Sequence, residues 1–250
     1  MIHNLPRFPQ EDEYEWASNA GPNGQSILCV SFKSSEMEKI AKQMRFTYPY
    51  VYVHNLPPDK LRIAPTFHEV VSREPVTITP STNAVSLESL GGQRFTHYAM
   101  KSSFGQDLYL DLVAQEQRSN LLVETWQRKG PLPSNCSHGY CVRNIRTIRF
   151  PDTGVEFPYT KDHSKWAVSD DNKKIICVGD NNREDPHLRR AGGILCSHLP
   201  NVWKQYKDSV VQVEPLPVDG LYSKALKIFL GVATIFVGAR WYKNRYEGLT

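Results

Sequence analysis

The sequence lacks the marks of several protein classes. It has no internal repeat at the period of about 20 to 50 residues that solenoids show, and no low-complexity linker divides it. The opening segment Met1–Pro6 has no basic stretch followed by an apolar run, so we expect no signal peptide there. With 250 residues, 40% apolar and 22% charged, the composition excludes disorder and a coiled coil and fits one or two globular domains.

Net charge is absent from most of the chain. Residues 221–250 hold five basic residues and one acidic residue, which leaves 25 basic and 25 acidic residues in 1–220. All eight histidines also lie in 1–220. Because an unperturbed imidazole titrates near pH 6.5, pH 5 would add up to eight positive charges to this region. We therefore expect a polyanion to bind more tightly in acid.

Strand-like and helical periodicities alternate along the chain. Residues 27–32 have the composition of a short strand, and Ser35 with Glu38 forms a capping box in front of an apolar face with helical spacing. Alternation of this kind predicts a layered αβ fold. The remaining pattern predicts strands and loops at 46–82, a helix at 103–118, strands at 121–126, 144–150, 163–168 and 174–178, and a short helix at 201–210.

The C-terminal region differs from the rest of the chain. Its apolar core, residues 228–239, is an uncharged run of twelve. As a helix this run would span about 18 Å, against about 30 Å for the core of a bilayer. The wider stretch 221–242 reaches that length only if Lys224, Lys227 and Arg240 extend towards the headgroups. Two interpretations stay open, a docked apolar helix and a membrane anchor.

The segment most informative about chemistry is His163-Ser164-Lys165. In a strand, side chains alternate between faces, so His163 and Lys165 would share one face while Ser164 and Trp166 point to the other. An imidazole beside an ammonium suits phosphodiester chemistry. The lysine balances the non-bridging phosphate oxygens, and the histidine attacks phosphorus or protonates the leaving oxygen. The alternative is a packed or solvated histidine, which is the commoner state on a strand.

A short segment at 179–183 would support this pair. Gly179 would allow a phosphate to approach the backbone closely, and Asn182 would hold a phosphate oxygen or the imidazole. Asp180 lies between these two residues in the sequence. We therefore count Gly179, Asp180 and Asn182 as candidate phosphate-binding or supporting residues.

The cysteines bear on compartment and metal binding. Five cysteines and the sequon Asn135-Cys136-Ser137 favour an oxidising, glycosylating compartment, with Asn135 as the glycosylated residue. The odd count leaves at least one thiol unpaired within the chain. Cys136, His138 and Cys141 are metal-ligand types, but they lie on one loop without a clear fourth ligand. We therefore expect no metal and no cofactor.

Eight blocks in order along residues 1–205 carry a family resemblance: Asn23–Phe32, Thr47–Tyr52, Phe104–Tyr109, Glu124–Lys129, Leu132–Ser137, Asp162–Trp166, Gly179–Arg183 and Gly192–Cys196. Together they resemble the deoxyribonuclease II family of acid endonucleases, which is similar to the phospholipase D superfamily. The resemblance implies an α+β, phospholipase D-like layered fold over residues 1–212, with a central mixed sheet flanked by helices. It also implies DNA as substrate and a lysosomal or secreted location.

The resemblance further implies a mechanism. Two His-x-Lys motifs from pseudo-symmetric halves meet at one site and need no metal. One histidine forms a phospho-histidine and the other protonates the 5′ oxygen, which leaves 3′-phosphate ends. His163 and Lys165 match the second motif. A disulfide between Cys177 and Cys196 is implied as well.

Departures from the family pattern bear on activity. The family's first His-x-Lys-Gly motif precedes the segment that Met1–Pro6 resembles, so we expect the N-terminal half of the fold to be incomplete. Ala167 stands where the family has cysteine, and residues beyond 212 do not resemble its C-terminus. Cys29 and Cys136 are therefore expected to have lost their usual partners.

The leading hypothesis is an acid endonuclease of the deoxyribonuclease II type. The alternative is a catalytically silent relative that only binds nucleic acid or a protein partner, because the first histidine motif is absent. A third option is a homodimer in which each copy supplies His163.

Overall fold

The computed structural model describes residues 2–5, 18, 20–77 and 79–217. All but the last two of these belong to one compact unit, Met1–Pro215. The apolar stretch at 221–242, interpreted above as a docked helix or a membrane anchor, lies outside the described residues. Within the described part, no helix is both long and apolar enough to cross a membrane.

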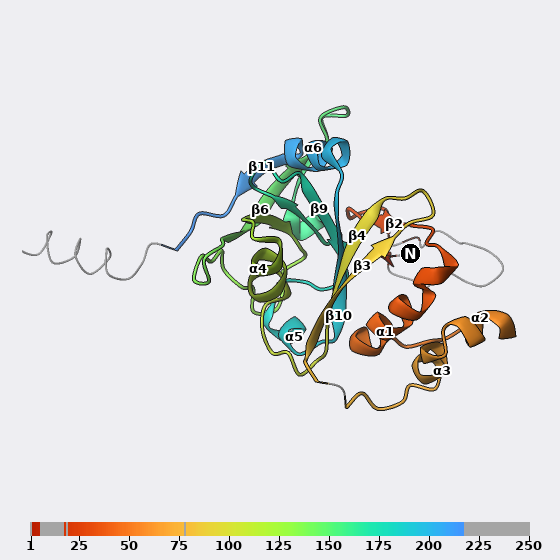
Figure 1. The fold of residues 1–250 in the computed structure, drawn as a ribbon. Helices are drawn as coiled ribbons and strands as arrows, with labels where there is room; N and C mark the ends of the chain where they lie inside the picture. The colour runs from red at the N-terminus through yellow and green to blue at the C-terminus, as the bar shows by residue number, and fades with distance from the viewer. Residues whose placement is uncertain (1, 6–17, 19, 78, 218–250) are drawn as a thin grey trace, which may run out of the picture. The chain divides into compact units, whose positions relative to one another are not determined.

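A nine-stranded mixed sheet forms the centre of this unit (Figure 1). Eight strands follow the order β11-β6-β5-β8-β9-β10-β4-β3, and β7 pairs with β6. β5 and β6 run parallel, and the other neighbours are antiparallel. The predicted α+β fold with a central mixed sheet flanked by helices is confirmed. The strands are β3 (Thr82–Glu88), β4 (Arg94–Met100), β5 (Leu121–Glu124), β6 (Val142–Arg149), β7 (Glu156–Pro158), β8 (Trp166–Ser169), β9 (Ile175–Gly179), β10 (Gly192–His198) and β11 (Val210–Val213).

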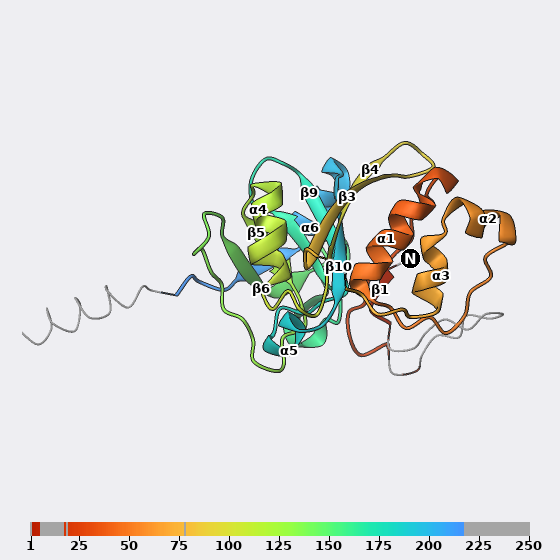
Figure 2. The same ribbon diagram turned by 60° about the horizontal axis from the view of Figure 1, so that its bottom comes forward.

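One face of the sheet is covered by the helix that precedes β5. This helix begins as a wide π-helical segment, η2, and continues as α4. Leu108 and Val113 on its inner side pack with Leu121 and Ile194 of the sheet in one apolar core. Figures 1 and 2 both show α4 on the side of the sheet opposite α1. The bounds are Leu108–Val113 for η2 and Ala114–Gln117 for α4.

Two separate groups of elements cover the opposite face. At one end α6 places Tyr206 edge-on to Trp166 of β8, with ring centroids 4.9 Å apart. At the other end α1 packs over β3, β4 and β10, next to the short β1–β2 pair. Strand side chains alternate between the two faces of the sheet, and each covering helix has one apolar side. Apolar residues are therefore buried on both sides of the sheet. The elements of this face are α6 (Pro200–Asp208), α1 (Met37–Thr47), β1 (Ile2–His3) and β2 (Ile27–Leu28).

The predicted helix after residue 34 is confirmed, but its predicted capping box is wrong. Ser34–Glu36 form a 3₁₀ turn, η1, and no side chain caps the start of α1. Glu38 instead accepts hydrogen bonds from Thr66, at 3.2 Å from its amide and 2.6 Å from its hydroxyl. The carboxylate is therefore used to join α1 to α3, and it is not free to cap its own helix.

The prediction of strands and loops at 46–82 is wrong in two places. α2 (Pro58–Ile63) begins with a proline, and α3 (Thr66–Val71) begins directly after Pro65. Proline suits the first turn of a helix, where its missing N–H is not needed and its fixed φ is already helical. Prolines that resemble loop signals therefore mark helix starts in this segment.

Several predicted elements are present with altered bounds. The helix expected at 103–118 begins only at Leu108, because Asp107 caps it by accepting a 2.9 Å hydrogen bond from the Tyr109 amide. The strand expected at 27–32 is reduced to β2, and the strand expected at 121–126 ends at Glu124. The short helix expected at 201–210 is α6.

A buried guanidinium ties these elements together at one edge of the sheet. The Arg183 side chain is 1% exposed, and its Nε donates to Asp107 Oδ2 at 2.7 Å. Its two terminal nitrogens donate to Asn144 Oδ1 at 2.6 Å and to the carbonyls of Leu132 and Pro133 at 3.3 and 2.9 Å. One side chain thus connects the cap of η2, the β5–β6 connection, β6 and the loop after β9.

Arg183→Met should strongly destabilise the protein. The substitution leaves Asp107 buried without its cation and frees two carbonyls, which we expect to lower the free energy of unfolding by about 3 to 5 kcal/mol. Arg149→Met is the matched control, because Arg149 pairs with Glu156 at the surface with 53% of its side chain exposed. That control should change stability by about 1 kcal/mol or less. Urea unfolding measures both, and equal effects would contradict the assigned role of Arg183.

Candidate active site

The chemistry-bearing residues gather at one edge of the sheet, where β8 begins and β9 ends. Trp166 of β8 lies opposite Val178 of β9, so Lys165 and Asp180 leave the sheet at the same edge. The strand expected at 163–168 begins only at Trp166. His163 and Lys165 therefore lie in the extended segment that leads into β8, and not in the strand itself.

A distant part of the chain holds the segment that carries His163. Asp162 forms a parallel bridge with Gly24, and the His163 amide donates to the Gly24 carbonyl at 2.8 Å. The Gly24 amide donates in turn to the Lys161 carbonyl at 2.7 Å. A Cβ at position 24 would lie 2.6 Å from Asp162 Oδ1, so only glycine allows this approach. These bonds take the place of a strand ladder before Trp166.

Side chains nevertheless alternate along this segment. Asp162, Ser164 and Trp166 are buried and line a cavity of about 360 Å³. Ser164 donates to Asp162 from its amide at 2.8 Å and from its hydroxyl at 2.6 Å. His163 and Lys165 are half-buried and point to the other side, as extended backbone requires. The structure thus brings the imidazole and the ammonium to one side.

The His163 imidazole lies against the indole of Trp126. The ring centroids are 3.9 Å apart and the planes are inclined by 36°. The Arg128 guanidinium lies 4.6 Å from the centroid of the Trp126 ring. Gln25 Nε2 lies 3.5 Å from His163 Nδ1, at the limit of a hydrogen bond. The imidazole is therefore held mainly by ring contact and by its own backbone.

Burial first, and then nearby charges, set the protonation of this site. Burial, followed by the charges of Lys165 and Arg128, lowers the pKa of His163 below its usual range, and Asp162 partly opposes the shift. Burial lowers the pKa of Lys165 to about 8. The Lys165 ammonium donates to the His163 carbonyl at 2.8 Å. At acidic and neutral pH the lysine therefore supplies a positive charge beside the histidine.

The loop after β9 places Asp180 near Lys165, whereas Asn182 bonds elsewhere. Asp180 is half-buried and accepts a hydrogen bond from the Gly193 amide at 3.0 Å. Burial raises the pKa of Asp180, while Lys165 is among the cations that oppose the shift. The Asn182 side-chain amide donates to Glu184 at 3.2 Å. In the described part of the chain, no hydrogen bond joins Asn182 to His163.

Two residues of this loop were missed from the sequence. Glu184 accepts hydrogen bonds from the amides of Arg128 and Lys129, at 2.8 and 2.9 Å, and so fixes the segment that carries Trp126. Although burial acts in the other direction, these bonds lower the pKa of Glu184. His187, in α5 (Asp185–Leu188), accepts from the Asn182 amide at 2.8 Å. In the sequence, these two residues could have been found as an acid and a histidine that follow the 179–183 block.

Gly179 is explained by packing between strands. A Cβ at this position would lie 2.9 Å from the Gly193 carbonyl oxygen and 3.0 Å from Ile194 Cγ1. Position 179 therefore has no room for a side chain, whatever its part in phosphate binding. Two positions earlier, Cys177 lies opposite Cys196 on β10 and is bonded to it, with the Cα atoms 4.0 Å apart.

The remaining cysteines include a second disulfide. Cys136, which we expected to have lost its usual family partner, is bonded to Cys141, five positions later in the chain. The short loop between them brings the two together without any segment from elsewhere. Cys29 is exposed and free. Asn135, the sequon asparagine, accepts a 2.7 Å hydrogen bond from the Ser137 amide.

Glu124 is a buried carboxyl without a hydrogen-bond partner. It ends β5 opposite Trp166, is 0% exposed, and neither of its oxygens is bonded in the described part of the chain. Burial, with added repulsion from Asp162, raises its pKa well above the usual range. We therefore expect Glu124 to be protonated in acid.

The expected gain of up to eight histidine charges at pH 5 is wrong. Burial lowers the pKa of His97 and of His187 to about 4, so these two imidazoles stay mostly neutral at that pH. The pKa values of His3 and His163 are also lowered, again by burial first. A count of histidines in the sequence omits burial. Burial disfavours the protonated form of these four imidazoles, so the protein gains fewer positive charges in acid than the count predicts.

The described residues contain no group of three or more His, Cys, Asp and Glu placed to hold a metal ion. A family model described as deoxyribonuclease II matches residues 1–216. The chain belongs to the deoxyribonuclease II family.

Relatives in this family match most of the chain. Plancitoxin-1 of Acanthaster planci is 37% identical over 219 residues, which are 86% of this chain and 61% of that protein. Deoxyribonuclease-2-alpha of Sus scrofa is 40% identical over 220 residues, 86% of this chain and 60% of that protein. Deoxyribonuclease-2-beta of Homo sapiens is 33% identical over 226 residues, which are 86% of this chain and 60% of that protein. The chain thus spans about three fifths of the length of the curated relatives it matches.

Glu124→Gln should stabilise this deoxyribonuclease II family member more at neutral pH than in acid. The folded-state pKa of Glu124 is raised, so its contribution to stability is fully present below the unfolded value of 4.5 and is lost as pH rises through the folded value. Glutamine keeps the neutral shape at every pH. The difference in melting temperature between variant and wild type should therefore grow from pH 4.5 to pH 7.5. The exposed Glu116→Gln serves as control, and a difference for Glu124→Gln that is independent of pH would contradict its buried, protonated state.

Proposed function

We propose that this chain contributes to a deoxyribonuclease II-type site that hydrolyses DNA phosphodiesters without a metal and leaves 3′-phosphate ends. The observation that carries the proposal is the His163–Lys165 pair at the sheet edge, held by Gly24 and stacked on Trp126. Membership of the family supports DNA as the substrate. Asp180 and Asn182 are proposed as supporting residues.

Lys165 acts on the charge of the phosphate. Because burial lowers the pKa of Lys165 only to about 8, the ammonium is present throughout the acidic range. It balances the negative charge that develops on the non-bridging oxygens as phosphorus is attacked. Asp180 and Glu184 keep this cation favourable in a buried place.

We assign His163 the attack on phosphorus. A histidine nucleophile must be unprotonated, and the lowered pKa keeps His163 neutral further into the acidic range than an ordinary histidine. Trp126 fixes the plane of the ring, so little rotational freedom remains to be lost during attack. The 3′-phosphoryl group then resides on the imidazole until water removes it.

Protonation of the leaving 5′ oxygen requires a second acid. The 250 residues contain one His-x-Lys sequence, at 163–165. The second histidine is therefore proposed to come from a second copy of the chain or from sequence beyond these residues. The single motif also favours the alternative of a catalytically silent nucleic-acid or partner-binding protein, and the first experiment below separates the two.

The disulfides and the sequon bear on the compartment of the protein. Two disulfides, Cys136–Cys141 and Cys177–Cys196, and a sequon at Asn135 suit an oxidising, glycosylating route. We propose a lysosomal or secreted location, as for an enzyme that works in acid. Membrane contact through 221–242 stays a proposal that rests on the sequence alone.

The 250-residue chain should nick plasmid DNA at pH 5 in the presence of EDTA. With one histidine motif per chain, we expect a rate at least about 10² below that of porcine deoxyribonuclease-2-alpha, because general acid assistance is worth about 10² to 10⁴ in rate. The new ends should accept phosphate from a kinase without prior phosphatase treatment, as 5′-hydroxyl ends do. A rate that rises with the square of chain concentration indicates a second copy at the site.

His163→Ala is the matched variant for this assay, with His198→Ala, a histidine at the end of β10, as control. Loss of nicking in the first variant alone supports the assignment. Nicking that needs magnesium, or that survives His163→Ala, contradicts it. A chain that binds DNA without nicking it at any concentration is the silent relative.

His163 should titrate below pH 6.5, and Arg128→Gln should raise its pKa towards that value. The reason is that Arg128 is one of the cations that disfavour the imidazolium. NMR titration of the His163 ring signals measures this without any need for activity. Arg149→Gln, which removes a surface charge of the same kind, should leave the titration unchanged. A His163 titration that ignores Arg128 would contradict the part that this charge is given in lowering the pKa.

A further inference from the structure

An aromatic cavity lies behind the segment that carries His163. Asp162, Ser164 and Trp166 line it, on the side of the backbone opposite His163 and Lys165. The rest of its described lining comes from residues 24–26, β6, the turn after β6, β7, α6 and the residue that ends α6. Its volume of about 360 Å³ is at the lower end of the range for small-molecule sites. The cavity therefore has room for one small ligand.

Four aromatic rings line this cavity as two edge-on pairs. The ring centroids of Phe150 and Phe157 are 5.5 Å apart and their planes are inclined by 61°. The centroids of Trp166 and Tyr206 are 4.9 Å apart and their planes are inclined by 75°. Because the rings are strongly inclined to each other, ring faces of more than one direction meet at this space. The face of an aromatic ring carries the negative part of its quadrupole and attracts cations.

The charged residues of the cavity wall are acidic. Among the described residues that line it are Asp152 and Asp162, and none of these lining residues is a lysine, arginine or histidine. Glu124, whose oxygens have no hydrogen bond in the described part of the chain, adds a carboxyl that interacts electrostatically with Asp162. The Asp162 charge also reaches the Tyr206 hydroxyl, because burial first and then this charge raise the pKa of Tyr206. The wall therefore favours a cation over an anion.

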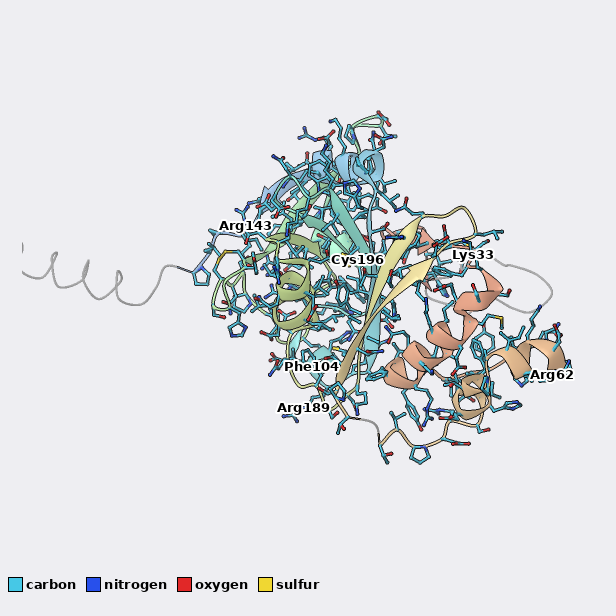
Figure 3. The ribbon with its side chains drawn as sticks, viewed as in Figure 1. Lys33, Arg62, Phe104, Arg143, Arg189 and Cys196 are labelled. Carbon is cyan, nitrogen blue, oxygen red and sulfur yellow. A yellow bond between two sulfur atoms is a disulfide. The ribbon has the colours of Figure 1, made fainter. Side chains whose placement is uncertain are left out.

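The arginines of β6 do not supply the missing positive charge. Each of the three pairs with an acid, and none of them lines the cavity. Arg143, labelled in Figure 3, is the one that pairs with Asp170. Lys165 acts on Asp162 from the other side of the backbone, where it faces the proposed catalytic edge. A cation in the cavity thus meets rings and carboxyls, and no positive group of the described lining.

We propose that this cavity binds a free small alkylammonium ion, with its charge towards Asp162 and its carbon atoms against the rings of Phe150, Trp166 and Tyr206. A neutral molecule of the same shape fills the space equally well. It gains neither the attraction of the ring faces nor that of the carboxylate. The site lies on the side of the segment away from His163, so the inference does not rest on the proposed function.

The test is titration of choline into the 250-residue chain at pH 7, followed by NMR of the choline methyl protons. The neutral comparison is 3,3-dimethyl-1-butanol, in which a carbon atom replaces the quaternary nitrogen. Choline should bind at least about tenfold more tightly, as expected for a cation held by ring faces in a partly desolvated site. Its methyl signals should shift upfield, because protons that lie over an aromatic face are shielded by the ring current.

Phe150 separates attraction to the ring from simple packing. Its side chain is 50% exposed, so its substitution does not threaten the fold. Phe150→Leu keeps an apolar side chain and removes the ring, and it should weaken choline binding by about threefold, the share of one exposed ring. Binding of the neutral alcohol should stay unchanged. Phe150→Tyr keeps the ring and should bind choline within about twofold of the wild type.

Asp162→Asn tests the carboxylate. It should lower the affinity for choline to that for the neutral alcohol, while retained binding of the alcohol shows that the cavity is intact. Asp208→Asn is the matched control, because Asp208 is a carboxylate on α6 that pairs with Lys204 at the surface and does not line the cavity. That control should leave choline binding unchanged.

Three outcomes would overturn the proposal. Equal affinities for choline and the neutral alcohol would show that the cavity recognises shape alone. Equal losses in Asp162→Asn and Asp208→Asn would show that net charge, and not this site, attracts the cation. Binding to phosphatidylcholine vesicles without binding of free choline would assign the surface to a lipid headgroup. None of these measurements depends on nicking of DNA, so failure of the proposed function leaves their result unaffected.

Discussion

The Arg183–Asp107 ion pair is the interaction on which the rest of the site depends. It lies where four separate stretches of chain meet, one of them the loop that carries Asp180 and Asn182. Thr125 and Gln127 add bonds to the Arg183 backbone on either side of Trp126, the ring that supports His163. A buried charge is costly unless each of its donors is satisfied, and here the fork of the guanidinium finds a carboxylate, an amide oxygen and two carbonyls. Its need for partners fixes the loop of Asp180 and Asn182.

Buried titratable groups give the fold two opposite responses to acid. The pKa values of Glu124, Asp162 and Asp180 are raised, by burial first, so each contributes stability that is lost as pH rises. His97 and His187 are lowered to about 4, so each contributes stability that is present above pH 6.5 and lost as pH falls. The two slopes oppose each other across the acidic range. A protein that must stay folded in acid gains from such compensation.

Much of the fold was predictable from local pattern, and the site was predictable in part. Alternation and helical spacing indicated α1, β5, β9 and α6, because their apolar faces are continuous. The helices α2 and α3 were missed because proline serves equally as a loop residue and as the first residue of a helix. His163 and Lys165 stand out by residue type and by family resemblance. The residues that hold them in place could not be predicted. These are Gly24, Trp126 and Glu184, which meet the site only after distant segments of the chain come together.

The parallel pair of the nine-stranded sheet, β5 with β6, has a consequence for the order in which the protein folds. Parallel neighbours cannot be joined by a tight turn, so the chain between them must cross the end of the sheet. That crossing carries Trp126 and Pro133 over the edge where His163 will later lie. The backbone amide of His163 is bonded to a glycine 139 positions earlier in the chain, a closure that local contacts do not assist. Contacts of such long range form late, so we expect the edge that carries the candidate site to be completed after the sheet beneath it.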